Sequence, residues 1–413
     1  MSQNVRIALF LTSTKHITVM KINVIIYASV LAKQTVEAIK DTHRELFSAL
    51  NGHFEVNAVM HQDLNSAHLE GYNIVLVATG GTEGLIVKEY DRLPHPLVLL
   101  TDGKANSLAA TLELSSWIRN KGDNCTIIHG STERIISDLQ ARTAMFGQRI
   151  GVLGEPSDWL VASGVDYDLV KKAWGVEYID IPLTKVEEYY AQTTDSEASA
   201  IADTFASKAK AIIEPDGKEI NKAVRLYLAI KRIADEYRLN ALTVQCFNLI
   251  TSLHTTGCLA LALLNDEGIV AGCEGDLQTI FTMLYVKRVM GKDSFMANPA
   301  FIDTDRNEVV FAHCTIGLKQ TTEYIIRSHF ESQSGVAIQG LMPLKQVSIM
   351  KMGGKALEKS VILHGTIVEN QADERKCRTQ IRIILDPKTS NAEYFLTGSI
   401  GNHHVIFKGC SIN

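Results

Sequence analysis

Short apolar runs alternate with amphipathic segments through the first part of the chain. Runs rich in β-branched or aliphatic residues, typical of buried strands, occur at residues 20–24, 73–78, 97–101, 125–128 and 149–153. Ser107 is positioned to cap a helix that continues to Lys121. Strand patterns separated by helix patterns predict βαβ units and a mostly parallel sheet.

The same alternation continues in a second stretch. Strand patterns lie at residues 176–181, 242–246 and 269–273, and helix patterns lie at 195–213 and 218–237. Apolar residues recur at helical spacing from Leu277 to Leu284, which predicts a helix directly after Asp276. The boundary between the two α/β stretches is expected near residues 146–149.

The pattern changes near Asn298, after which most segments are β-rich and helix patterns become rare. The clearest strand patterns lie at residues 308–314, 346–351, 360–369 and 379–385, with glycine- and asparagine-containing turns between them. This last part predicts an antiparallel sheet or barrel. The predicted division is therefore an α/β domain at 1–147, a second α/β domain at 148–297 and a β-rich domain at 298–413.

Composition and charge narrow the class of protein. The chain has 413 residues, of which 46% are hydrophobic and 21% charged, so it can bury a large core and is not of the disordered class. Its formal net charge of -5 and its lack of a lysine- or arginine-dense stretch argue against a nucleic-acid partner.

Cysteine usage and apolar run lengths bear on location. The seven cysteines are irregularly spaced without a CxxC pair, which favours reduced thiols in a cytoplasmic protein over a disulfide framework. The longest uncharged apolar runs are far too short to span a bilayer, so no membrane partner is expected. The apolar patch at residues 7–11 is thinner than that of a signal peptide, and the segment before the first strand is expected to be either a frayed extension or a start-site artefact.

The most informative chemistry lies where a predicted strand ends at Cys273. Glu274 and Asp276 flank a glycine there, and a helix begins at once. Ligands of open α/β sheets bind beyond the carboxyl ends of strands. Two neighbouring carboxylates repel each other, and a divalent cation between them would relieve that repulsion. The alternative is that both acidic residues only stabilise the N-terminus of the helix.

Histidines near strand ends add nitrogen ligands to this hypothesis. His313 ends one apolar strand pattern, and His403 and His404 precede the final one. Adjacent residues of a strand point to opposite faces, so only one of the last two is expected to face a shared site. Histidine nitrogen beside carboxylate oxygen shifts the expected metal from Mg²⁺ towards Mn²⁺.

Five segments together resemble the L-fucose/L-arabinose isomerase superfamily, in its short fucose isomerase-like branch. They are DGKANSLAA (102–110), GEPSDWL (154–160), CEGD (273–276), AHCT (312–315) and GNHH (401–404), and they occur in the family's order. The resemblance extends over most of the chain from about residue 23. It implies two Rossmann/flavodoxin-like α/β domains followed by a C-terminal antiparallel β-barrel domain.

The resemblance also implies a function and a site. The implied activity is a metal-dependent conversion of an aldose to a ketose through an enediol, with Mn²⁺ or another divalent cation. Glu274 and Asp276 are the implied catalytic and metal-binding carboxylates, with Glu274 moving the proton, and His313 and either His403 or His404 are the implied nitrogen ligands.

The family further implies a homotrimer or homohexamer whose sites a neighbouring subunit completes. The loop at residues 102–107, with Asn106, would then reach a neighbour's site. Asn106 and Trp159 are therefore the expected contacts to a small sugar substrate. Trp159 stacks on a sugar face in this interpretation, although a tryptophan is more often a core residue.

One expected carboxylate is missing. By the resemblance, Asn248 stands at a position where the family has Asp or Glu. An asparagine carbonyl can bind a hard cation or a sugar, but it cannot take a proton from carbon. Two alternatives therefore stay open: a sugar-binding homologue with impaired catalysis, and an isomerase of an anionic phospho- or sulfo-sugar.

An anionic sugar would need a basic group or other polar side chains near the cation. Arg327, His329 and Glu331 form one polar segment that could contact it, and a solvated segment explains the pattern equally well. Lys351 alternates with apolar Ile349 in a strand pattern and could face either solvent or a site.

Overall fold

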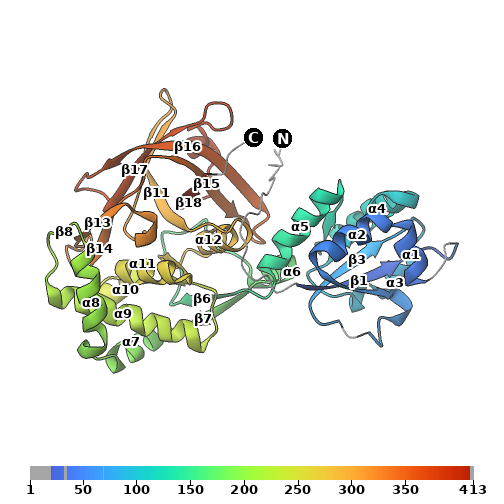
Figure 1. The fold of residues 1–413 in the computed structure, drawn as a ribbon, viewed down its shortest axis with the longest axis horizontal. Helices are drawn as coiled ribbons and strands as arrows, with labels where there is room; N and C mark the ends of the chain where they lie inside the picture. Colours follow the sequence, from blue (N-terminus) through green and yellow to red (C-terminus); the bar gives the residue numbers. More distant parts are fainter. Residues whose placement is uncertain (1–19, 32–34, 68, 410–413) are drawn as a thin grey trace. The chain divides into compact units, whose positions relative to one another are not determined.

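The computed structural model describes residues 20–31, 35–67 and 69–409 (Figure 1). The apolar patch at residues 7–11 lies outside these ranges. The described chain forms two compact units, which we treat separately. One contains residues up to 147 together with 168–176, and the other contains residues 148–167 and 177–409.

The N-terminal unit is built on a parallel five-stranded sheet in the order β2-β1-β3-β4-β5. Its strands are β1 (Lys21–Tyr27), β2 (Glu55–Met60), β3 (Tyr72–Val77), β4 (Val98–Leu100) and β5 (Thr126–Ile128). Its helices are α1 (Val36–Thr42), α2 (Arg44–His53), α3 (Glu83–Glu89), α4 (Ser107–Asn120) and α5 (Thr132–Met145), and most of α6 (Tyr167–Trp174) also belongs to it.

Alternating residues of the central strand β1 point to two separate hydrophobic cores. Val24 packs in a core with α1, α2 and α5, whereas Ile25 packs in a core with α3 and α4. This is the two-sided burial that makes strands of a parallel sheet read as continuous apolar runs.

The second unit begins with a smaller parallel sheet in the order β10-β9-β6-β7. Its strands are β6 (Arg149–Leu153), β7 (Glu177–Ile181), β9 (Ala241–Val244) and β10 (Val270–Cys273). Its helices are α7 (Leu183–Gln192), α8 (Asp195–Lys208), α9 (Gly217–Glu236), α10 (Cys246–Leu253), α11 (Cys258–Glu267) and α12 (Leu277–Val289). Helix α12 contacts both this sheet and the barrel that follows, and most of its residues are buried.

The C-terminal strands close an antiparallel barrel in the order β11-β12-β17-β16-β15-β18 (Figure 1). They are β11 (Ser294–Asp303), β12 (Glu308–His313), β15 (Gln346–Gly353), β16 (Lys359–Gln371), β17 (Thr379–Leu385) and β18 (His404–Lys408), with the short helix α13 (Tyr394–Thr397) before β18. A separate sheet joins β8 (Ala211–Ile212), β13 (Glu323–Arg327) and β14 (Ala337–Leu341). Parallel sheets followed by a C-terminal barrel confirm the predicted architecture at this level. The three-domain division stays a prediction.

Three local predictions were wrong. The helix predicted at 195–213 ends at Lys208, because Ala211 and Ile212 leave it to pair with β13. The strand predicted at 242–246 ends at Val244, and Cys246 begins α10. The cap of α4 is Asn106, because the Ser107 hydroxyl is instead buried against the Thr101 hydroxyl at 2.7 Å.

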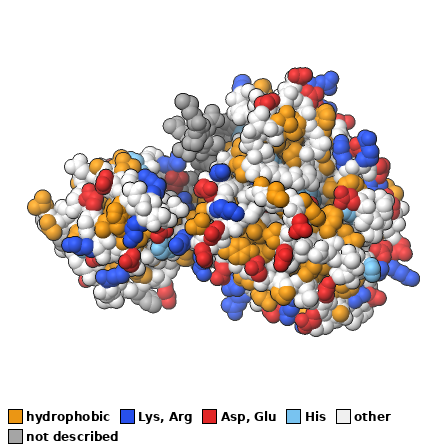
Figure 2. Space-filling view, turned by 180° about the vertical axis from the view of Figure 1, so that it is seen from behind, with side chains coloured by type: hydrophobic (Ala, Val, Ile, Leu, Met, Phe, Trp, Pro, Cys, Tyr) orange, Lys and Arg blue, Asp and Glu red, His pale blue; other side chains and the backbone are white. Residues whose placement is uncertain are grey.

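None of the described helices is both long enough and apolar enough to cross a membrane. On the face seen in Figure 2, lysine and arginine side chains are interspersed with acidic ones.

Candidate metal centre and cavity

Glu274 lies in a tight turn between β10 and α12. Its φ of 64° is positive, which is rare for a residue with a side chain, and Gly275 follows at 68°. A Cβ on Gly275 would lie 2.6 Å from the Glu155 carbonyl oxygen, so only glycine fits there. The Glu274 carbonyl accepts a hydrogen bond from the Ser157 amide at 2.9 Å. The chain therefore holds the Glu274 backbone in one position.

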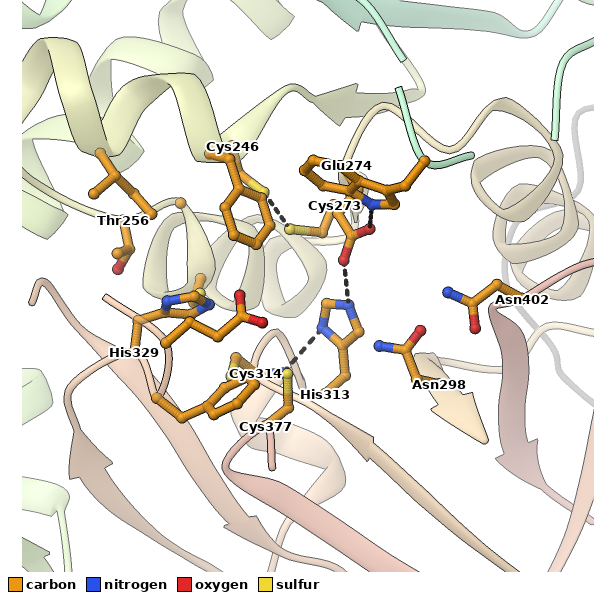
Figure 3. Close-up of a pocket in the computed structure, with 17 residues that line it drawn as sticks. Cys246, Thr256, Cys273, Glu274, Asn298, His313, Cys314, His329, Cys377 and Asn402 are labelled. Atoms are coloured by element: carbon orange, nitrogen blue, oxygen red, sulfur yellow. Dashed lines mark hydrogen bonds and ion pairs between the residues drawn. The ribbon is translucent and has the colours of Figure 1, made fainter. Parts of the chain in front are cut away.

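The Glu274 carboxylate has two different environments. One oxygen, Oε2, accepts a hydrogen bond from the Trp159 indole at 2.7 Å. The other, Oε1, lies 3.7 Å from Nε2 of His313 and 3.5 Å from Nε2 of His403 (Figure 3 shows the side with His313). Burial by itself would raise the pKa of Glu274, but the two imidazoles hold it well below its usual range. Glu274 is thus a buried, ionised carboxylate.

Asp276 orients the His403 ring through Nδ1, the nitrogen that does not face Glu274. It is the N-cap of α12, where it accepts hydrogen bonds from the Thr279 amide at 2.8 Å and the Thr279 hydroxyl at 2.7 Å. Nδ1 of His403 is 2.9 Å from Asp276 Oδ2, so Nε2 of the same ring is turned towards Glu274. Such a carboxylate–histidine contact fixes the tautomer and the direction of a ligand ring.

The charges of Asp276 and His403 are stabilised by their neighbours. Although burial disfavours its charged form, the nearby carboxylates of Asp276 and Glu274 raise the pKa of His403 to about 9. Burial would raise the pKa of Asp276, but Lys351 and His403 keep it low. Buried Lys351 lies 3.7 Å from Asp276 and donates to the Thr279 hydroxyl at 2.8 Å. Lys351 therefore faces the site and not solvent, and its positive charge helps to keep Asp276 ionised.

His313 reaches the same point from the end of β12. Its Nδ1 is 2.9 Å from the Cys314 amide, which donates to it, and 3.3 Å from the Thr315 hydroxyl. As the acceptor of the Cys314 amide, Nδ1 carries no proton, so the proton of the neutral ring lies on Nε2. Binding a cation through Nε2 requires that proton to move to Nδ1 and the bond from the Cys314 amide to break, after which the Thr315 hydroxyl oxygen can accept from Nδ1.

These three side chains fit a divalent cation. One Glu274 oxygen and one nitrogen each of His313 and His403 lie within 4.8 Å of one another, and all three residues are buried. Nε2 of both histidines is buried without a hydrogen-bond partner among the residues that the structure describes. Unsatisfied buried nitrogens are uncommon, and a metal ion is one explanation for them. Two histidines and one carboxylate also leave further coordination positions open.

The cluster opens into a cavity of about 430 Å³, a size suited to a small molecule. Trp159 and Phe247 form one wall with their rings edge to face at 5.1 Å. Trp159 is 54% exposed, so its ring also faces solvent. Amide side chains of Asn298 and Asn402 lie beside His313 (Figure 3). His329, Phe330 and Glu331 complete another part of the lining.

The structure separates the two adjacent histidines. His403 faces the cluster, whereas His404 points the other way, with Nδ1 2.9 Å from the Asn402 carbonyl and Nε2 3.2 Å from the Tyr394 hydroxyl. Burial lowers the pKa of His404 to about 3. His404 packs against Phe395 and lies outside the cluster.

Two other predicted residues of the same unit, Asn248 and Arg327, also lie away from the cluster. Asn248 is exposed on α10 and is not among the residues that line the cavity, whereas its neighbour Phe247 is. Asn106 belongs to the N-terminal unit, so its contact with a sugar stays a prediction. Arg327 is paired with Glu214 and Glu374 and does not line the cavity.

Sequence reasoning missed the thiols of the cavity. Five cysteines contribute to its lining: Cys246, Cys258, Cys273, Cys314 and Cys377. All are free thiols. Their irregular spacing gave no signal, because they come from the ends of different strands and helices that only the fold brings together.

Among curated proteins, the chain is similar to sulfoquinovose isomerases. It is 22% identical to that of Priestia megaterium over 225 residues, which is 52% of this chain and 50% of the relative. It is 21% identical to that of Alkalicoccus urumqiensis over 258 residues (58% and 57%), and 23% identical to that of Clostridium sp. over 221 residues (48% and 49%). The chain spans about half the length of the curated relatives it matches. No protein-family model matches it.

Proposed function

We propose that this protein is a metal-dependent isomerase that interconverts an aldose and a ketose. The observation that carries the proposal is the buried cluster of Glu274, His313 and His403 at the wall of a cavity large enough for a sugar. The similarity to sulfoquinovose isomerases supports the same reaction class. The predicted homotrimer or homohexamer stays a prediction.

Glu274, His313 and His403 would hold the cation, for which Mn²⁺ fits the mixed oxygen and nitrogen donors. When bound, a divalent cation supplies a Lewis acid that polarises the sugar carbonyl and stabilises the charge of an enediolate. Trp159 fixes Glu274 through its other oxygen, and Asp276 fixes His403, so both ligands are oriented before a sugar arrives.

The proton transfer between C1 and C2 needs a carboxylate that can reach the sugar. Glu274 is the predicted base, but one of its oxygens is bonded to Trp159 and the other faces two imidazoles. Glu331 is the other carboxylate among the described residues that line the cavity. We therefore assign Glu274 primarily to the cation and Glu331 as a second candidate for the base, with Asn298 and Asn402 as partners for sugar hydroxyls.

The charge of the side chains that line the cavity bears on whether the sugar is anionic or neutral. A sulfonated sugar is favoured by the relatives. However, the described residues that line the cavity include no lysine or arginine, and His313 and His329 are their histidines. A sulfonate in this cavity would rely on His329 and on amide donors, so neutral aldoses belong in the same test.

The test combines metal binding with turnover. Purified protein is stripped with a chelator, titrated with Mn²⁺ and assayed on sulfoquinovose and on a panel of neutral aldoses. Glu274→Gln is expected to lose both Mn²⁺ binding and turnover, since it removes the anionic ligand. Glu331→Gln is expected to keep Mn²⁺ and lose about 10²–10⁴-fold in rate if Glu331 is the base.

Glu267→Gln is the matched control. Glu267 pairs with Tyr227 and Lys231 outside the cavity, so this variant should keep both properties. A parent protein that binds Mn²⁺ and sugar but converts none of the aldoses would favour the alternative of a sugar-binding homologue. A Glu274→Gln variant as active as the parent would exclude the proposed site.

A further inference from the structure

Two of the cavity thiols are in direct contact. The sulfur atoms of Cys246 and Cys273 are 2.7 Å apart. Both side chains are almost fully buried, yet both line the cavity, so a small molecule that enters it meets them (Figure 3). Because a disulfide bond is about 2.0 Å long, the two sulfurs need to approach by only about 0.7 Å to be joined.

The backbone holds the two thiols at this distance. Cys273 is the last residue of β10, and Cys246 lies two residues past the end of the paired strand β9, at the start of α10. Val244, the last residue of β9, is the register partner of Cys273. Beyond the Val244–Cys273 pair the two backbone segments stay hydrogen-bonded, because the Gly275 amide donates to the Val244 carbonyl at 3.0 Å. The contact is therefore set by the paired backbones at residues 244 and 273–275, from which Cys246 is two residues away.

The geometry points to a redox modification site: Cys246 and Cys273 form a reversible disulfide in the wall of the cavity. With hydrogen peroxide as the oxidant, one thiol attacks an oxygen atom and becomes a sulfenic acid, with release of one water molecule. The second thiol then displaces a second water to form the S–S bond. The two sulfurs lose two electrons, and the peroxide gains them. A dithiol reductant reverses the reaction by thiol–disulfide exchange.

The disulfide would act on the neighbouring carboxylate. Cys273 directly precedes Glu274, whose positive φ and whose bond to the Ser157 amide leave the turn little freedom to adjust. A Cβ on Gly275 would clash with the backbone of residues 155–156, so the turn packs closely against them. Because a constrained turn cannot absorb a shift of Cys273 by local adjustment, the shift that joins the two sulfurs is passed on to the adjacent Glu274 and moves its carboxylate relative to His313 and His403. This effect on the cation rests on the proposed function, whereas the cross-link itself does not.

Peptide mapping tests the cross-link. The full chain is treated with peroxide, cleared of it, alkylated and digested with trypsin and a glutamate-specific protease, which cuts at Glu267 between the two cysteines. Loss of two hydrogen atoms and a linked pair of peptides are expected, with fragment ions that place the bond at Cys246 and Cys273. The bond should disappear in Cys246→Ser and in Cys273→Ser.

Cys258→Ser is the matched control, because Cys258 lines the same cavity and packs with Cys314 and Cys377 instead. This variant should keep the cross-link. Circular dichroism of each reduced variant checks that it folds. A bond mapped to Cys258–Cys314 or Cys314–Cys377, or thiols oxidised singly without any bond, would overturn the assignment.

Metal binding tests the consequence. Oxidised parent protein should bind Mn²⁺ at least tenfold more weakly than reduced protein, and dithiothreitol should restore the affinity. Peroxide-treated Cys246→Ser should keep the affinity it had before treatment. An unchanged affinity in cross-linked protein would refute the switch and leave the disulfide. A reduced parent that binds no Mn²⁺ would refute the proposed function and the switch together, while the mapped bond would stand by itself.

Discussion

Each compact unit contains a buried histidine whose Nδ1 contacts an aspartate. In the N-terminal unit, His43 lies 2.7 Å from Asp102, which follows β4. In the other unit, His403 lies 2.9 Å from Asp276, which follows β10. Both rings are fully buried, and Nε2 of both lacks a hydrogen-bond partner among the described residues. Judged by these pairs alone, the two units would be equally good candidates for a metal centre.

The surroundings of the two Nε2 atoms differ. His403 faces Glu274, and His313 contributes a second imidazole to the same point. No such group of three ligand atoms includes His43 in the part of the chain that the structure describes. Asp102 instead bonds the Lys104 amide of its own loop at 3.1 Å. An aspartate–histidine pair therefore orients a ring, and convergence of further donors from other elements makes a candidate ligand set.

The strongest test of this comparison replaces each histidine in turn. His403→Gln should weaken Mn²⁺ binding by more than about 100-fold, because loss of a ligand costs more than loss of the group that orients it. His43→Gln should leave the affinity unchanged. Isothermal titration with Mn²⁺ at constant pH measures both. Equal losses in the two variants would show that the pairs are not functionally different.

A pH series sharpens the comparison through the charge of His403. Its folded pKa of about 9 lies above the ordinary value of 6.5, so its protonation stabilises the metal-free protein fully below about pH 6.5. This contribution is lost as the pH rises through about 9, and the shift corresponds to about 3 kcal/mol. Urea unfolding in chelator between pH 6 and 9.5 should show the parent losing this stability. His403→Gln should show a flatter curve, and parallel curves would contradict the assignment.

The smallest expected effect concerns the aspartates. Asp276→Asn keeps an oxygen for the Thr279 amide but weakens the partner of His403, and it should reduce Mn²⁺ affinity by about 10–100-fold. Asp102→Asn should not change it. The same titration compares the two variants. A loss of affinity confined to Asp102→Asn would mean that the His43–Asp102 pair, and not the His403–Asp276 pair, supports the cation.

Much of the architecture was predictable from local pattern. Strands alternate with helices up to α12, and period-two patterns follow, because burial on one or both faces leaves its period in the sequence. The strand at 379–385 was predicted with its observed bounds. The helix beginning after Asp276 was also predicted, since a cap and a helical apolar pattern are features of consecutive residues. The short strand β8 was missed because its pairing with β13 involves residues far away in the chain.

The candidate site divides in the same way. The sequence by itself indicated Glu274, His313 and one of two adjacent histidines, because unusual polar residues at strand ends are visible locally. Only the tertiary structure decided that His403 faces inward, that Asp276 lies behind it, and that Phe247 rather than Asn248 faces the cavity. The physical reason is that adjacent residues of a strand point to opposite faces, but the sequence does not show which of the two faces other elements cover. That choice is made when the barrel packs on α12 and brings Asp276 and His403 together across the chain.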